Sequence, residues 1–408
     1  MKDRVSLFIF CQSMGWDMMQ KLPFVDGLAD IRSAARPILG SPCATLPTVL
    51  SGTLPERHKH FAWFFYSPMS TPFRMCRYFS FLPRIKKSQR VRDNIVLAVK
   101  KTFGITGRLS TFNMPLKHLP LFDFVERRNL LQPGALDDVP TLFDFLAESN
   151  VSYFCSSPDR ADVENADALS NALMAGKISV GFWHLAGIDT ILTRLGPASS
   201  ALRGRVAWVD HRIRGIYEIA RSRYRRVDLI IFSDSGMVPI FNVYNLQRRI
   251  EETRFNPYED FVAIYEPTMA RFWFKSPSSA LIIARILESV PCGTILSRDE
   301  LAKEGCWFDD HRFGEIIFLA QPGTVFTPNH MHGESPAAAR GYHPDTPEMA
   351  AGIISNTPGI QPPRTVAEIY NILVQNVMDL PNFSTGHPHP GMLIKAREIP
   401  PGKAGLLQ

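Results

Sequence analysis

The chain has 408 residues, of which 45 are Lys or Arg and 39 are Asp or Glu, giving a formal net charge of +6. Its 45 % hydrophobic and 21 % charged residues can bury a large core, which excludes a disordered chain. The longest apolar runs, such as residues 5–11, are far shorter than the roughly 20 residues that cross a bilayer, so we expect no transmembrane segment. Six scattered cysteines form neither a disulfide framework nor a zinc ribbon, and they favour a reducing, cytoplasmic location.

The amino-terminal part of the sequence predicts a strand and two short helices, which are followed by a segment of different composition. Residues 5–11 form the apolar run of a buried central strand, and a helix is expected from about Trp16. A second helix is expected to begin with Pro47 to Ser51, just after Thr45 and Leu46. Residues 58–136 are rich in aromatic residues, Arg and Lys and are broken by prolines, which indicates an inserted cap segment.

Regular alternation of helices and strands resumes after the cap. Helices are expected over residues 140–149, 166–175, 199–223 and 278–290, and strands over 151–155, 178–182, 227–232, 261–265, 270–274 and 315–319. This order predicts an α/β fold, a doubly wound and mainly parallel sheet with helices on both faces. We therefore divide the chain into an α/β core (1–57 and 137–380), the cap (58–136) and a Pro/Gly-rich tail (381–408).

Basic residues are concentrated in one stretch of the cap. Residues 84–101 have the pattern of an amphipathic helix with a basic face, which could contact an acidic partner or a membrane surface or could simply be solvated. No nucleic-acid-binding signature accompanies this stretch, so we expect no nucleic-acid partner.

Residues that could carry chemistry follow the predicted strands, where a doubly wound fold places its site. Gln12 follows the first strand, and Thr45 precedes the second helix. Asp189 lies in the segment G-I-D-T-I-L-T-R-L-G-P, and Asp234 lies in F-S-D-S-G-M. A late segment, R-G-Y-H-P, begins at Arg340.

The order and spacing of these segments resemble the alkaline phosphatase superfamily, specifically its nucleotide pyrophosphatase/phosphodiesterase branch. The resemblance extends over roughly residues 5–363 and is strongest to the bacterial members found with saccharide-assembly genes. It implies an alkaline-phosphatase-like core and a phosphoryl-transfer site with two metals, usually zinc. It also implies that Thr45 occupies the position of the nucleophile.

The same resemblance implies that most metal ligands have been replaced. Asp189 and Asp234 are retained, but the other ligand positions, where the family has one Asp and three His, hold Gln12, Thr193, Ser235 and Arg340. A guanidinium is always charged and cannot ligate a cation. If the late segment aligns without a gap, Arg340 should face Asp189, with Asp234 nearby.

We therefore expect a degenerate, metal-free phosphodiesterase-like protein without a cofactor, which binds a phosphate- or carboxylate-bearing ligand or a protein partner. Thr45, beside a helix N-terminus, and Arg340 are the predicted anion-binding residues. One alternative is a metal-dependent phosphodiesterase or phosphotransferase with redrawn zinc or manganese ligands, namely Asp189, Asp234, His332 and His343. Another is a group-transfer enzyme of altered chemistry with Thr45 as its nucleophile. The sequence leaves homo-oligomerisation open.

Overall fold

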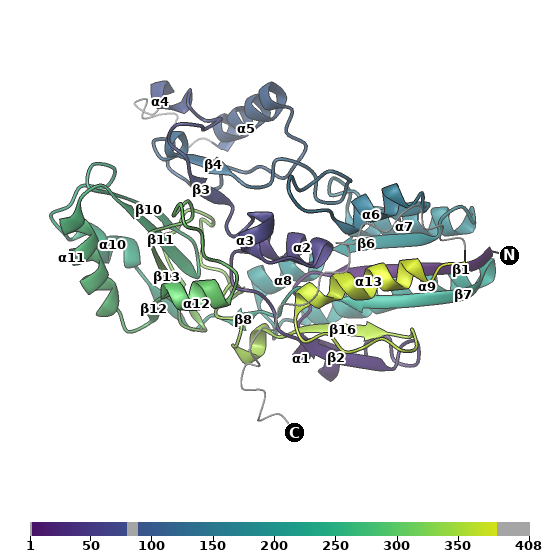
Figure 1. The fold of residues 1–408 in the computed structure, drawn as a ribbon. Coiled ribbons are helices and arrows are strands. Elements are labelled where there is room, and N and C mark those ends of the chain that lie inside the picture. Colours follow the sequence, from purple (N-terminus) through teal and green to yellow (C-terminus); the bar gives the residue numbers. More distant parts are fainter. Residues whose placement is uncertain (1, 80–88, 382–408) are drawn as a thin grey trace.

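The computed structural model describes residues 2–79 and 89–381 (Figure 1). Its centre is a six-stranded sheet in the order β2 (Ile31–Ala35), β16 (Ala351–Ser355), β7 (Tyr224–Phe232), β1 (Lys2–Cys11), β6 (Val180–Leu185) and β5 (Tyr153–Cys155). Strands β7, β1, β6 and β5 pair in parallel, whereas β16 pairs antiparallel with both of its neighbours. The prediction of a mainly parallel sheet is confirmed.

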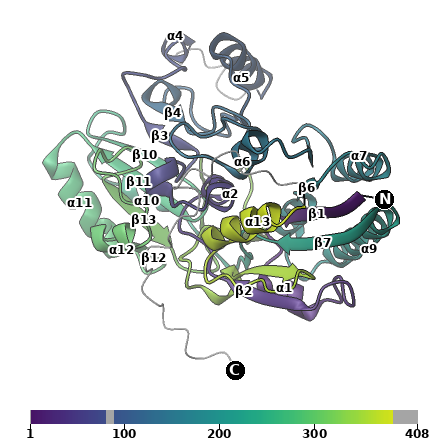
Figure 2. The same ribbon diagram turned by 45° about the vertical axis from the view of Figure 1, so that its right-hand side comes forward.

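Helices cover both faces of this sheet (Figure 2). Phe8 and Phe10 of β1 pack into the cluster on one face, and Leu7 and Ile9 pack into the cluster on the other. Both sets are buried because strands alternate their side chains between the two faces. The first face carries α2 (Pro42–Ser51), α6 (Leu142–Glu148) and α13 (Ile369–Met378); the second carries α1 (Trp16–Lys21), α7 (Asp162–Met174), α8 (Gly187–Leu195) and α9 (Ser200–Arg223).

The later strands form a second sheet, which the sequence did not predict. It is antiparallel throughout, in the order β10 (Phe261–Tyr265), β11 (Met269–Phe274), β13 (Ile316–Ala320) and β12 (Gly293–Ile295). Phe272 and Phe318 are buried in its own apolar cluster. The surrounding elements are β8 (Val238–Pro239), β9 (Asn242–Tyr244), α10 (Leu246–Glu251), α11 (Pro277–Glu288), α12 (Arg298–Lys303), β14 (Thr324–Phe326) and β15 (Ala338–Ala339).

The inserted segment forms a projection above the core (Figure 1). Its elements are α3 (Pro55–His58), which begins just before it, then β3 (Phe64–Tyr66), α4 (Cys76–Phe79), α5 (Gln89–Phe103) and β4 (Phe122–Phe124), with β3 and β4 paired. Phe64 and Phe122 share an apolar cluster with Trp273 of β11, so this segment packs against the second sheet. Residues 84–88 of the predicted basic helix and the predicted tail beyond residue 381 lie outside the described residues. Within residues 2–79 and 89–381, no helix combines the length and apolarity needed to cross a bilayer.

Candidate functional site

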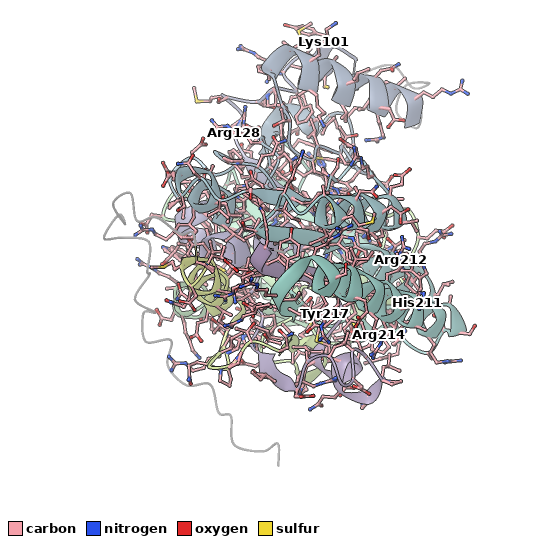
Figure 3. All side chains as sticks on the ribbon, turned by 90° about the vertical axis from the view of Figure 1, so that its right-hand side faces the viewer. Lys101, Arg128, His211, Arg212, Arg214 and Tyr217 are labelled. Carbon is pink, nitrogen blue, oxygen red and sulfur yellow. The ribbon has the colours of Figure 1, made fainter. Side chains whose placement is uncertain are left out.

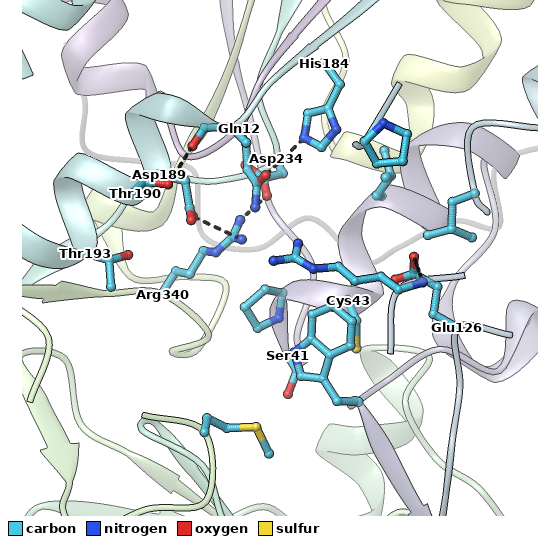
Figure 4. Close-up of a pocket in the computed structure, with 18 of the residues that line it drawn as sticks. Gln12, Ser41, Cys43, Glu126, His184, Asp189, Thr190, Thr193, Asp234 and Arg340 are labelled. Atoms are coloured by element: carbon cyan, nitrogen blue, oxygen red, sulfur yellow. Dashed lines mark hydrogen bonds and ion pairs between the residues drawn. The ribbon is translucent and has the colours of Figure 1, made fainter. Parts of the chain in front are cut away.

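A cavity of about 790 Å³ opens at the carboxyl ends of the central strands (Figure 4). Strands β1, β6 and β7 run parallel and in register, so the residues that follow them meet at one edge of the sheet. The start of α2, the cap and segments within residues 156–165, 266–269 and 331–341 also line it. Of the predicted ligand positions, Gln12, Asp189, Thr193, Asp234 and Arg340 all line this cavity.

Arg340 bonds to the carboxylates of both Asp189 and Asp234, as the ungapped alignment predicted. Its Nη2 lies 3.2 Å from Oδ1 of Asp189, and its Nη1 donates to Oδ2 of Asp234. The side chains of Arg340 and Asp234 are 9 % and 3 % exposed. The backbone at this point is held by Thr268, whose hydroxyl donates to the Arg340 carbonyl 3.1 Å away. One guanidinium thus joins a carboxylate in the first turn of α8 to a carboxylate in the loop after β7.

The ion pairs affect the pKa values of both Asp234 and Arg340. Burial raises the pKa of Asp234 above its usual value, although Arg340 acts in the opposite direction. Burial also opposes the charge on Arg340, but Asp234 and Asp189 outweigh it and raise the pKa of the guanidinium. Arg340 therefore remains a cation throughout the physiological pH range.

Ser13 is a member of this network that the sequence did not identify. Its backbone N–H donates to Oδ1 of Asp234 at 2.7 Å, and its hydroxyl donates to Oδ1 of Asp189 at 2.8 Å. Ser13 adopts a φ of 61°, a conformation uncommon for residues other than glycine. Only this local backbone geometry reveals its role, and no motif in the sequence signals it.

Gln12, Thr193 and Ser235, the other positions compared with the family's ligands, form neutral contacts. Oε1 of Gln12 lies 3.0 Å from Nε2 of His184, and burial lowers the pKa of His184 to about 4, so its ring is neutral at pH 7. The hydroxyl of Thr193 donates only a long contact, 3.9 Å, to the sulfur of Met237. Ser235 is buried and donates its backbone N–H to Asp234, and its side chain is not part of the cavity lining.

The structure departs from the sequence prediction at Thr45. Helix α2 begins at Pro42, five residues earlier than predicted, so Thr45 lies one turn inside the helix and is 8 % exposed. The residues of this turn that line the cavity are Ser41, Pro42, Cys43 and Leu46. Thr45 is therefore buried in the helix and is not among the residues that line this cavity.

The positive end of α2 already faces a carboxylate of the chain itself. Ser41 is the N-cap residue, and its hydroxyl donates to Oε2 of Glu266. Oε1 of the same carboxylate accepts a 2.8 Å bond from Nη2 of Arg271, which is completely buried. A carboxylate near a helix N-terminus is favoured by the helix dipole. The N-terminus of α2 and the guanidinium of Arg340 thus both already face carboxylates of the chain.

The alternative metal site is only partly assembled. His332 lines the cavity, and burial lowers its pKa while Asp189 acts in the opposite direction. His343 lies outside the lining, with its Nδ1 3.6 Å from Asp345. Zinc requires three or four N, S or O ligands, and Arg340 contributes none. In the part of the chain that the structure describes, no group of three or more His, Cys, Asp and Glu could hold a metal ion. This donor set does not fit a two-metal centre.

The cap supplies polar residues that the motif comparison could not find. Arg108 lines the cavity with its guanidinium 5.7 Å from the ring centre of Trp63. Glu126 accepts the backbone N–H of Arg108 at 3.1 Å, and burial raises the pKa of this carboxyl to about 7. Arg194 of α8 also lines the cavity. Neither guanidinium lies within 4.0 Å of a described carboxylate, in contrast to Arg340.

Comparison with known proteins identifies the family. Residues 7–343 match the model of the type I phosphodiesterase / nucleotide pyrophosphatase family. The chain belongs to this family. No relative among curated protein sequences matches it.

Solved structures of this family share the fold. Murine ectonucleotide pyrophosphatase/phosphodiesterase 5 is 14 % identical with a TM-score of 0.64, over 95 % of this chain and 97 % of that one. The human protein of the same name is 12 % identical with a TM-score of 0.66 and the same coverage. An inactive variant of the murine protein in complex with AMP is 14 % identical with a TM-score of 0.63, over 92 % and 95 %. At these identities the likenesses show the fold alone, and they confirm the predicted α/β fold.

Proposed function

We propose that this family member binds an anionic ligand in its cavity without metal-assisted phosphodiester hydrolysis. The observation that carries the proposal is the contact of Arg340 with both Asp189 and Asp234. A cation fixed between these carboxylates opposes the entry of a second cation by charge repulsion and by occupying the space. A guanidinium cannot activate a nucleophile as a metal does when it lowers the pKa of a bound oxygen.

The anion would bind to cations other than Arg340. Arg340 is shared between two carboxylates, so its charge is already compensated. Arg108 and Arg194 line the same cavity and remain available for a phosphate or carboxylate, for which guanidinium geometry is well suited. A protein partner that presents an acidic side chain would use the same two residues.

The proposal is tested with bis-nitrophenyl phosphate as both substrate and binding probe. Added zinc, manganese or magnesium should leave hydrolysis at the background rate, because no metal assists attack or departure. Binding measured by calorimetry should weaken about tenfold in Arg108→Ala, the effect of one lost charge-assisted contact. Arg128→Ala is the matched control, since Arg128 is an exposed cap arginine paired with Asp137 and should bind as the wild type does. Metal-dependent turnover would refute the proposal.

A metal-dependent phosphodiesterase is the second candidate, because His332 lies close enough to Asp189 for the carboxylate to affect its pKa. That candidate requires Arg340 to leave its two carboxylates. It predicts turnover that is lost in His332→Ala, whereas the metal-free proposal predicts no turnover to lose.

A further inference from the structure

The positive charge of the whole chain resides in one short stretch of the cap. Residues 69–104 contain nine Arg and Lys and a single acidic residue, Asp93, a net charge of +8. The other 372 residues contain 36 Arg and Lys against 38 Asp and Glu, a net charge of −2. A charge separation of this size within one chain indicates a surface for an anionic partner.

The described residues of this stretch form the outer end of the cap. Figures 1 and 2 both show α4 and α5 next to each other at the end of the cap farthest from the central sheet. Figure 3 shows Lys101 of α5 projecting at this end of the molecule. Arg74, Arg90 and Lys101 are all exposed here and lie more than 4.0 Å from every described carboxylate. We call the exposed side chains of residues 69–78 and 90–103 the cap tip.

Large apolar side chains are exposed between these cations. Eleven large apolar side chains are exposed among the described residues, and five of them lie in the cap tip, each at least 52 % exposed. They are Met69, Met75, Tyr78, Leu97 and Phe103. On α5, Arg90, Leu97 and Lys101 are spaced so that they share one side of the helix, while Val99 is buried in the cap core. The exposed side of the helix thus mixes cations with protruding apolar groups.

We propose that the cap tip docks peripherally on an anionic lipid bilayer. The Arg and Lys side chains would face the lipid headgroups, and the five apolar side chains would enter the interface between headgroups and acyl chains. A bilayer accepts apolar side chains that are scattered among cations, whereas a protein partner needs a contiguous packed patch. Nucleic acid would use the cations but would gain little from exposed Met and Leu side chains. This inference does not depend on the proposed function of the cavity.

The test is co-sedimentation of the full chain with vesicles. We expect binding to phosphatidylcholine vesicles that contain about 30 % phosphatidylglycerol, weak binding to pure phosphatidylcholine, and a decrease with salt because the attraction is screened. The triple variant Arg74→Glu, Arg90→Glu, Lys101→Glu should bind at least about tenfold more weakly. The matched control reverses three exposed arginines of α9, Arg203→Glu, Arg221→Glu and Arg223→Glu, and should bind within about twofold of the wild type despite the same change in net charge.

A second variant separates lipid from other polyanions. Leu97→Ser with Phe103→Ser leaves the charge unchanged, and it should bind anionic vesicles several-fold more weakly while its affinity for heparin stays the same. Thermal unfolding of each variant verifies that it is folded. If the triple variant is unfolded, the double variant Leu97→Ser with Phe103→Ser and the salt dependence of wild-type binding still test the proposal. The proposal is overturned if the wild type does not bind anionic vesicles or binds neutral ones equally. It is also overturned if the α9 control weakens binding as much as the triple variant of the cap tip does. The same holds if the double variant Leu97→Ser with Phe103→Ser binds vesicles as the wild type does.

Discussion

Arg340 places a positive charge of the chain itself between the carboxylates of Asp189 and Asp234. Asp189 of α8 and Asp234, which follows β7, would repel each other if no cation lay between them. Both accept bonds from Ser13 and from Arg340, so the polar atoms of this buried network are paired within the protein. The register of the R-G-Y-H-P segment was enough to predict the position of Arg340. The contribution of Ser13 was not predictable, because it depends on one backbone dihedral angle.

Replacing Arg340 should therefore destabilise the fold. Arg340→Met leaves the two carboxylates without a cation, and breaking a buried pair typically costs about 3–5 kcal/mol. The free energy of unfolding, measured by urea denaturation in metal-free buffer, should fall by that amount. Arg194→Met, an exposed arginine of the same cavity, should change it by less than about 0.5 kcal/mol. A loss below about 1 kcal/mol for Arg340→Met would show that the ion pairs contribute little to the native state.

Among the elements, those with long, regular patterns were predicted well. The apolar runs of β1 and β7 and the long helix α9 were located to within a few residues. The start of α2 was missed by five residues, because Pro47 was taken as the first turn when it lies inside the helix. Strands β10, β11 and β13 were found, but their pairing into a separate antiparallel sheet was not. Sheet pairing depends on contacts between distant segments, which local periodicity does not encode.

The second sheet contributes to the site through Glu266, which lies between the N-cap of α2 and the buried Arg271. Glu266→Gln keeps the shape of the side chain but leaves the charge of Arg271 uncompensated, so we expect a loss of about 3–5 kcal/mol in unfolding free energy. Glu259→Gln, an exposed position just before β10, is the control and should alter it by less than about 0.5 kcal/mol. Equal effects of the two substitutions in urea denaturation would remove Glu266 from its structural role.

At the scale of the whole molecule, the cavity is built where the central sheet, the cap and residues 331–341 meet. The family motifs located the residues that follow the strands, whereas Arg108 and Glu126 of the cap carry no recognisable motif. Helix α5 contributes to both the cavity and the cap tip, since Lys100 lines the cavity while Lys101 belongs to the cap tip. Docking of the cap tip on a bilayer would therefore bring the cavity close to the membrane surface.

The metal content of the purified protein tests the central claim most directly. Untagged protein is incubated with an excess of zinc or manganese, desalted and analysed by elemental mass spectrometry. With Arg340 joined to Asp189 and Asp234, fewer than about 0.2 equivalents of either metal should remain bound, because residues 2–79 and 89–381 provide no complete ligand set. Close to two equivalents per chain, reduced by Asp189→Asn, would contradict the account and show that Arg340 gives way to a metal centre.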